Sequence, residues 1–401
     1  MSKKTAIIGG GAAGLSAACA IKSTHTVIYE RNERVGKKLL VTGNGRCNLL
    51  NTELSPSRFK STDMNEMSEI LGNNPTQEIT AFFEKLGLLM RSESEGRVYP
   101  LCNQATAVLD VLRLRAAENG AEFRCGFCVK EIRRKGGGFE IISDTGVREY
   151  ADRVVLACGG MASPKTGSDG LGYTLAKSFG HTVTPLSPAL SALKSDTAFT
   201  APLKGVRARV KITLDGTDRQ ESGEIQFTDY GISGIAAMQL SRHLTGKDSV
   251  TIDFAEEYSE DYIFSLLKNS RKKDRPMYEL PLGILQRRVG EQIIKRALKI
   301  GLNAPSESAT NADLKKLAGA IKGLKLPVYG TLSWDNAQVT SGGIPLSEIN
   351  PDTMESRLAK GVYITGEMLD CDGECGGFNL SWAWITALRA ANSINEVTAD
   401  D

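Results

Sequence analysis

The sequence predicts a doubly wound α/β fold whose first domain is interrupted by an insertion and completed by the end of the chain. A β-turn-α-β unit opens the chain, and the α/β alternation gives way to other patterns after about residue 190. Near the end of the chain, a strand bounded by glycines and a final helix return to the α/β alternation. At roughly 150 residues per domain, 401 residues suffice for two to three units and a sizeable core.

The opening unit is predicted from residues 5–30. Residues 5–8 form a short β-rich run, residues 12–21 have the alanines and leucine of a helix, and residues 26–30 are typical of a second strand. This length suits a right-handed crossover between neighbouring parallel strands. We therefore expect a parallel sheet with its first turn at the glycines between residues 8 and 12.

The later segments are predicted from periodicity and turn residues. We expect helices at 70–86 and 105–117, short strands within 123–147, a buried strand at 153–157, β segments with polar turns over 191–243, helices over 259–324, a strand at 361–366 and a helix at 379–395. The predicted domains are a discontinuous α/β domain over 1–190 and 339–401, a β-rich insert over 191–250 and 321–338, and a helical insert over 251–320.

Composition narrows the class of protein. Apolar residues make up 41% and charged residues 24%, and 49 basic side chains nearly cancel 47 acidic ones, which disfavours disorder and a strong general field for nucleic acid. We find no uncharged stretch of the ~18 apolar residues that a membrane span needs, and no signal peptide before the first glycine turn. A cytoplasmic protein with eight reduced cysteines is expected.

A dinucleotide fingerprint follows the first strand. Gly9-Gly-Gly11-Ala-Ala-Gly14 fits G-x-G-x-x-G: Gly9 permits the tight turn, Gly11 admits a pyrophosphate and Gly14 lets the helix pack closely. Glu30, 21 residues after Gly9, would accept hydrogen bonds from the adenosine ribose and would repel a 2′-phosphate. The nucleotide should be FAD or NAD rather than NADP, and the fingerprint leaves the choice between these two open.

A second glycine-rich string, GKKLLVTGNGRCN at residues 36–48, has the glycines and cations of another anion-cradling loop. It resembles the bacterial flavoproteins often called YhiN-like or BaiN-like, which are related in their FAD domain to glutathione-reductase-type enzymes. The resemblance extends over nearly the whole chain and includes segments 96–100, 154–160, 164–168, 227–234, 338–343, 349–356 and 366–379.

The resemblance implies non-covalent FAD in a Rossmann-like three-layer FAD-binding domain, with an insertion made of a β-barrel-like part and a helical part. It also implies hydride transfer between flavin N5 and a small organic substrate. No second dinucleotide fingerprint is evident, so two electron donors stay open: NAD(P)H bound transiently over the flavin, or another donor. Members of the family have been linked to the reduction of conjugated enone steroids, and others are labelled amine oxidases, so both reactions stay open.

The expected FAD contacts follow from matching motifs. They are Gly9, Gly11, Ala12, Ala13 and Gly14 at the pyrophosphate; Glu30 at the ribose, followed by Arg31; Lys38, Thr42, Gly43, Asn44, Gly45, Arg46, Cys47 and Asn48 beside pyrophosphate and flavin; Val129 at adenine; Ala157, Cys158 and Gly159 at a strand-end turn; Gly366 and Glu367 at the ribityl chain; and Gly376, Gly377, Phe378 and Asn379 at the helix that faces the flavin pyrimidine.

The catalytic residues are not assigned by the sequence. Asp229 and Tyr230 could serve as acid or base, or could fill core or loop roles. Cys371 and Cys375 flank the last helix and could relay electrons, although plain loop packing is the simpler interpretation. The chain also departs from the family pattern at residues 162–164, 170–172, 229 and 235, which leaves the substrate open.

Metal and nucleic-acid sites are not expected. Cys125-Gly-Phe-Cys128 lies in a strand-like segment, and no second ligand pair accompanies it. The basic residues at 271–275 and 287–288 suit a solvated helix face better than a nucleic-acid patch. A flavin-bearing protein that binds RNA or regulates another process is kept as an alternative to a small-molecule enzyme, and the oligomeric state is not set by the sequence.

Overall fold

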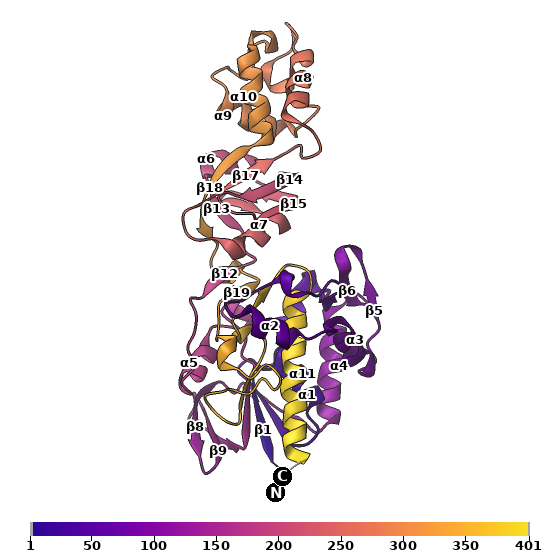
Figure 1. The fold of residues 1–401 in the computed structure, drawn as a ribbon, viewed down its shortest axis with the longest axis vertical. Helices are drawn as coiled ribbons and strands as arrows, with labels where there is room; N and C mark the ends of the chain where they lie inside the picture. Colours follow the sequence, from indigo (N-terminus) through magenta and orange to yellow (C-terminus); the bar gives the residue numbers. More distant parts are fainter. Residues whose placement is uncertain (1–2, 400–401) are drawn as a thin grey trace. The chain divides into compact units, whose positions relative to one another are not determined.

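The computed structural model describes residues 3–399, with side chains to residue 397. The chain divides into two compact units, residues 1–188 with 338–401 and residues 189–337 (Figure 1). We call them the first unit and the second unit. None of the helices within residues 3–399 has both the length and the hydrophobicity that crossing a membrane requires.

A parallel five-stranded sheet forms the centre of the first unit. Its order is β20 (Val362–Ile364), β11 (Arg153–Leu156), β1 (Lys4–Ile8), β2 (His25–Glu30) and β7 (Glu122–Cys125). The chain leaves β1 toward β2 on one side and later returns to β11 on the other side. Ligands bind parallel sheets at such a switch point, beyond the carboxyl ends of the strands.

Helices and a small antiparallel sheet cover the two faces of this sheet (Figure 1). Helix α1 (Ala12–Ala20) packs against α4 (Ala105–Glu118) and α11 (Phe378–Ala399). On the other side lie β8 (Val129–Lys135), β9 (Gly138–Ser143) and β10 (Arg148–Ala151). The Rossmann-type FAD-binding fold predicted for this part of the chain is confirmed.

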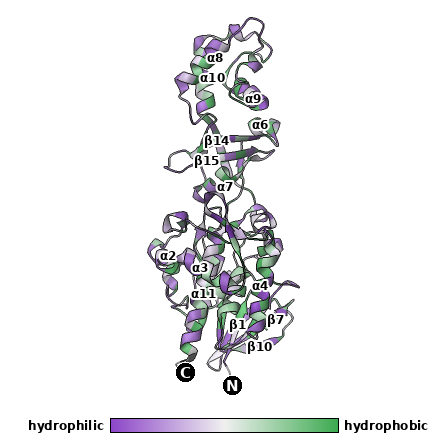
Figure 2. Cartoon of the chain, turned by 90° about the vertical axis from the view of Figure 1, so that its right-hand side faces the viewer, coloured by the Kyte–Doolittle hydropathy of each residue, from purple (hydrophilic) through white to green (hydrophobic). Residues whose placement is uncertain are grey.

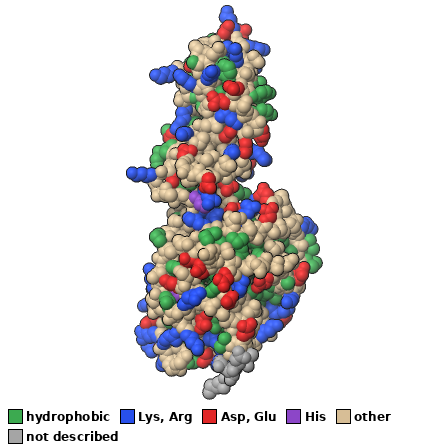
Figure 3. All heavy atoms as spheres, in the orientation of Figure 1, with side chains coloured by type: hydrophobic (Ala, Val, Ile, Leu, Met, Phe, Trp, Pro, Cys, Tyr) green, Lys and Arg blue, Asp and Glu red, His purple; other side chains and the backbone are tan. Residues whose placement is uncertain are grey.

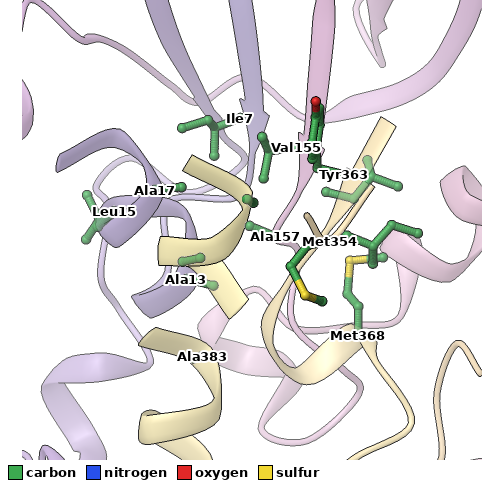
Figure 4. Packing of buried hydrophobic residues seen from close by; sticks show 14 of the residues in the cluster. Ile7, Ala13, Leu15, Ala17, Val155, Ala157, Met354, Tyr363, Met368 and Ala383 are labelled. Atoms are coloured by element: carbon green, nitrogen blue, oxygen red, sulfur yellow. The ribbon is translucent and has the colours of Figure 1, made fainter. Parts of the chain in front are cut away.

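The core of the first unit joins the start and the end of the chain. Figure 4 shows Ile7, Val155 and Tyr363 on neighbouring strands, together with Ala13 of α1 and Ala383 of α11. Tyr363 is 1% exposed, and Ile7 and Val155 are fully buried. The small side chains of α1 and α11 let these two helices lie against each other, because no bulky group separates them.

Short elements complete the first unit. They are β3 (Leu50–Asn51), β6 (Arg97–Pro100) and β5 (Met90–Ser92) in one sheet, β4 (Phe59–Lys60) with β21 (Asp372–Gly373), β12 (Ser187–Ala189) with β19 (Val339–Ser341), and the helices α2 (Met64–Leu71), α3 (Pro75–Lys85) and α5 (Leu171–Lys177). The single helix predicted at 70–86 is wrong. Gly72 has φ +76° and ends α2, whereas Pro75 begins α3, because proline fits the first turn of a helix.

The second unit contains a closed barrel, as the resemblance implied. Its strands, in order, are β13 (Leu193–Ser195), β16 (Gly231–Ser233), β15 (Gln220–Phe227), β14 (Arg207–Leu214), β17 (Asp248–Asp253) and β18 (Leu324–Thr331), with the short helices α6 (Thr197–Thr200) and α7 (Ile235–Leu240). Val210, Ile212 and Leu214 are buried at alternate positions of β14, which places one face of that strand in the barrel core.

Helices α8 (Glu260–Ser270), α9 (Arg287–Ala297) and α10 (Asn311–Lys322) form the helical part of the second unit. Thr310 and Asp313 form a capping box that starts α10. Figure 2 shows both hydrophilic (purple) and hydrophobic (green) residues on these helices. Their apolar residues, such as Leu267 and Leu314, are fully buried in the core of the second unit.

Candidate cofactor site

The glycines of the fingerprint serve two different purposes. Gly9 has φ +108°, and a Cβ there would overlap the carbonyl oxygen of Ala157; a Cβ on Gly14 would overlap the carbonyl oxygen of Gly9. Protein packing therefore requires both glycines. Gly11 has φ −85°, and a Cβ there would meet no protein atom within 4 Å. The residues present thus fit a group bound against the amino-terminal end of α1.

Glu30 is held at the end of β2. The side chain is 7% exposed; one carboxylate oxygen accepts from the Gly10 N–H at 2.9 Å, and the other accepts from the backbone and side-chain N–H groups of Asn32 at 2.8 and 2.7 Å. A carboxylate offers about four acceptor positions, so one remains for a ribose hydroxyl. Asn32, which the sequence did not single out, orients this carboxylate.

A loop over residues 163–170 is fastened to the same strand end. The side-chain amide of Asn32 also donates to the carbonyl oxygen of Thr166 at 3.1 Å. Arg31 forms an ion pair with Asp169, and the hydrogen bond that Arg31 donates to Asp169 raises the pKa of Arg31 above its ordinary value. Arg31 is therefore engaged within the protein, and its contact with the cofactor stays a prediction.

The second glycine-rich loop contains η1 (Leu39–Gly45), a 3₁₀ helix with an unusual backbone. Gly43, Asn44, Gly45 and Cys47 all have positive φ values, between 55° and 81°. The loop is closed by a hydrogen bond from the Cys47 N–H to the carbonyl oxygen of Thr42 at 3.0 Å. Burial raises the pKa of the Cys47 thiol to about 12, so this cysteine is not a thiolate near neutral pH.

Asn48 carries a buried amide whose oxygen has no partner among the described residues. The residue is 8% exposed, and its Oδ1 lies 2.9 Å from the position that a Cβ on Gly377 would take. Leaving a buried acceptor unpaired costs about 1–3 kcal/mol. A hydrogen-bond donor on a bound group would remove this cost, and the residues around Asn48 therefore fit a polar ligand such as a flavin edge.

The last part of the chain closes the site against α1. Lys38 Nζ pairs with Glu367 Oε2 at 2.7 Å, and Glu367 Oε1 accepts from the Thr340 N–H at 3.0 Å. Gly366 has φ +71°, and a Cβ there would lie 3.0 Å from the Cβ of Ala13. The structure therefore brings together residues predicted for the pyrophosphate and for the ribityl chain, which lie far apart in the sequence.

The start of α11 is shaped by its own side chains. The amide of Asn379 accepts from the Gly373 N–H and donates to the Gly373 carbonyl oxygen, both at 2.8 Å, so it braces the preceding loop. Phe378 is 3% exposed, and its ring centroid lies 5.9 Å from that of Phe59. The first N–H groups of a helix have no partner within the helix and carry its positive end, which suits an electron-rich ligand.

Of two predicted residues near the strand ends, Val129 is buried and Cys158 is half-buried. Val129, at the start of β8, is 4% exposed. Burial raises the pKa of the Cys158 thiol to about 12, and this thiol lies 3.4 Å from the carbonyl oxygen of Ile8. Thr340, which the sequence did not single out, accepts from the N–H groups of Met161 and Ala162 at 2.8 and 3.1 Å.

The cysteines give no sign of a metal centre in the described part of the chain. All eight are thiols rather than disulfides, and within residues 3–399 no three His, Cys, Asp or Glu side chains gather in a way that could hold a metal ion. Desolvation raises the pKa of both Cys125 and Cys128, the opposite of a reactive dithiol. Cys371 is 3% exposed, and Cys375 Sγ lies 3.6 Å from Gln338 Oε1.

Comparison with known proteins identifies the family. The HI0933-like protein Rossmann domain matches residues 3–393. A "3-dehydro-bile acid delta(4,6)-reductase" of Clostridium scindens is 38% identical over 405 residues, 97% of this chain and 98% of that protein. A "ribosomal RNA dihydrouridine synthase" of Haemophilus influenzae is 26% identical over 400 residues, 97% of this chain and 98% of the relative.

A solved structure supports the fold. The 3-ketosteroid delta1-dehydrogenase of Sterolibacterium denitrificans, in complex with 1,4-androstadiene-3,17-dione, gives a TM-score of 0.53 at 11% identity and covers 99% of this chain and all of its own. At an identity this low, the similarity supports only the fold. By sequence, fold and the glycine cradle, this chain belongs to the HI0933-like family of Rossmann-type, FAD-dependent oxidoreductases.

Proposed function

We propose that the protein reduces a carbon–carbon double bond conjugated to a carbonyl group in a small organic substrate, with FAD as the resident cofactor and NAD(P)H as the electron donor. The observation that carries this proposal is the identity of 38% to a bile-acid delta(4,6)-reductase over nearly the full length of both chains. When bound, FAD supplies the hydride-transfer chemistry, and the protein supplies binding and orientation.

The names of the relatives point to one kind of reaction. The double bonds of a 3-oxo-4,6-diene steroid are conjugated to its carbonyl group, and the C5=C6 bond of uracil is likewise conjugated to the C4 carbonyl. Both named reactions add hydrogen across such a bond. This common chemistry supports reduction over the amine oxidase that the sequence left open.

The residues of this chain hold the parts of the cofactor that do not react. Glu30 and Asn32 form an acceptor site for a ribose, and Gly11 leaves room at the end of α1 for phosphates. The Lys38–Glu367 pair fastens the first and last parts of the unit. These contacts favour FAD that remains bound through turnover while donor and substrate exchange.

Basic side chains in the second unit interact with other groups of the protein, which favours a small substrate over RNA. Arg271 donates to the carbonyl oxygen of Ala309 at 2.7 Å, and Arg287 pairs with Glu291 at 2.8 Å. Figure 3 shows basic and acidic side chains interspersed over the face it presents. RNA uridine reduction remains the second candidate because of the relatives with that name.

An anaerobic experiment tests the proposal. The purified flavoprotein is mixed with NADH or NADPH while the visible flavin bands are followed, and a 3-oxo-4-ene steroid, a uridine-rich ribosomal RNA transcript or an amine is then added. We expect bleaching by one nucleotide and recovery of the bands with the enone, with a product two hydrogens heavier by mass spectrometry. Reoxidation by RNA alone would support the second candidate. In a separate sample without nicotinamide nucleotide, bleaching of the oxidised flavin by an amine, followed by peroxide release once oxygen is admitted, would contradict both.

A further inference from the structure

Arg46 is held firmly in the second glycine-rich loop. Its Nε donates to Asn103 Oδ1 at 2.7 Å, and Nη2 pairs with Glu93 Oε1 at 2.5 Å. The guanidinium carbon lies 3.9 Å from the centroid of the Tyr99 ring. These contacts fix the plane of the guanidinium, but they leave its Nη1 donors unused and 34% of the side chain exposed.

Strained backbone gathers around this arginine. Seven non-glycine residues of the described chain have positive φ, and four of them surround Arg46: Asn44 and Cys47 on either side of it, its acceptor Asn103, and Glu95 beside Glu93. Residues held in sparsely populated conformations persist only where the surrounding structure dictates them, and they cluster at ligand sites. The positive φ values here lie in the segments that carry Arg46 and its two acceptors, Asn103 and Glu93.

The arginine belongs to the same body as the cofactor cradle. Its loop runs directly into Asn48, whose unpartnered oxygen lies beside Gly377 at the start of α11. A Cβ on Gly43 would lie 2.8 Å from the Asn48 N and 3.4 Å from Cε1 of Tyr99, the ring on which Arg46 stacks. The Tyr99 ring and Gly43 therefore connect the guanidinium to the part of the cradle that fits the flavin edge.

We propose that Arg46 binds the carbonyl oxygen of the substrate and stabilises the negative charge that this oxygen gains during reduction. The inference rests on the proposed function. In that reaction the β-carbon gains a hydride from the reduced cofactor, the electron pair of the double bond moves to form the enolate of the carbonyl, and the α-carbon then gains a proton from water. Water supplies the proton and Arg46 is assigned to the oxygen alone, so the guanidinium keeps its charge throughout the step. Its role is to donate hydrogen bonds to the oxygen as negative charge develops there.

The pairing with Glu93 suits this role. An arginine whose charge is partly balanced attracts a neutral carbonyl only weakly, and the attraction grows as negative charge develops on the oxygen. A group that interacts more strongly with the transition state than with the substrate raises the rate of reaction. A cofactor contact beside the pyrophosphate and flavin, which the family resemblance implies for Arg46, would instead contribute to cofactor affinity.

Measuring flavin reduction by NAD(P)H and flavin reoxidation by the enone separately distinguishes a role in binding the substrate from a role in binding FAD. We compare Arg46→Met with Arg115→Met, a control on α4 whose side chain is 35% exposed and is also paired with a glutamate. In Arg46→Met we expect wild-type FAD content and wild-type bleaching by NAD(P)H, but reoxidation by the enone slowed by about 10²–10³-fold, the usual effect of losing an oxyanion donor. Guanidinium salts should partly restore Arg46→Ala. Loss of FAD, or unchanged reoxidation, would overturn the assignment.

A binding experiment gives a readout without turnover. Para-substituted phenols of decreasing pKa are titrated against the oxidised flavoprotein, and the visible difference spectrum is recorded. Wild-type and Arg115→Met proteins should bind the more acidic phenols more tightly, because a phenolate mimics the enolate oxygen, and Arg46→Met should lose this dependence. Equal binding by all three proteins, or by none, would contradict the role of Arg46. A wild-type protein that shows the dependence but reduces no enone would refute the proposed function alone.

Discussion

The same substitution should affect two different properties at Gly11 and Gly14: alanine at Gly14 should lower the stability of the apoprotein, and alanine at Gly11 should lower its affinity for FAD. In Gly14→Ala the new Cβ would approach the Gly9 carbonyl oxygen well inside the 3.0 Å that real Cβ atoms keep. Alanine improves helix propensity by up to ~1 kcal/mol, but overpacking of this kind costs typically ~1–3 kcal/mol. We expect apoprotein less stable by about 1–2 kcal/mol, since the strand and helix cannot separate easily.

In Gly11→Ala the new Cβ would meet no protein atom within 4 Å, and φ of −85° suits alanine. Apoprotein stability should stay within about 0.5 kcal/mol of the wild type. The methyl group would nevertheless occupy the space in front of α1, so FAD affinity should fall at least ~10²-fold, about 2.7 kcal/mol. Urea unfolding of apoprotein and fluorescence titration with FAD measure the two quantities. Normal FAD affinity in Gly11→Ala would refute the placement of the phosphates.

Three further outcomes follow from single groups. Glu30→Gln places an amide N–H₂ against the N–H donors of Gly10 and Asn32, so apoprotein should lose about 1–3 kcal/mol of stability and FAD should bind more weakly in an equilibrium titration. Desolvation raises the pKa of Asp370 above its ordinary value of 3.8, so the stability that this group gives the wild type is present below pH 3.8 and is lost as pH rises through the raised pKa. The effect of Asp370→Asn on the free energy of unfolding should therefore be more favourable at pH 8 than at about pH 3.5, and an equal effect at both would contradict the shift. Exposed Cys102 should alkylate in native protein well before buried Cys47, and peptide mass spectrometry showing the reverse order would contradict the burial.

The first turn of the fold could be predicted because its causes are local. The fingerprint glycines and Glu30 lie within one β-α-β unit, in which Gly14 packs against the carbonyl oxygen of Gly9 and Glu30 accepts from the Gly10 N–H. The helix predicted at 70–86 failed for a local reason as well. Its apolar periodicity continues across Gly72 and Pro75, and the periodicity was given more weight than these two residues, although the glycine ends one helix and the proline starts another.

The surroundings of Arg46 could not be predicted, because its partners are distant in the sequence. Asn103 and Glu93 lie 57 and 47 residues away, and Tyr99 stands in a strand whose place in the unit depends on pairing with two other short strands. A glycine-rich string with lysines and an arginine predicts an anion site of some kind. The string does not predict that Arg46 is the cation whose charge is partly balanced by a carboxylate and whose orientation is fixed by an aromatic ring.

That difference bears on how members of one family act on different substrates. The glycines and Glu30 are predicted to contact the cofactor through the backbone and one carboxylate, and these features depend little on what is reduced. A guanidinium fixed beside the cradle and carrying unused donors meets a requirement that the named steroid and uridine reactions share, which is charge on a carbonyl oxygen. The selection between a steroid and a base must then come from groups that contact the rest of the substrate, and exchanging those groups should alter substrate choice while Arg46→Met slows every substrate alike.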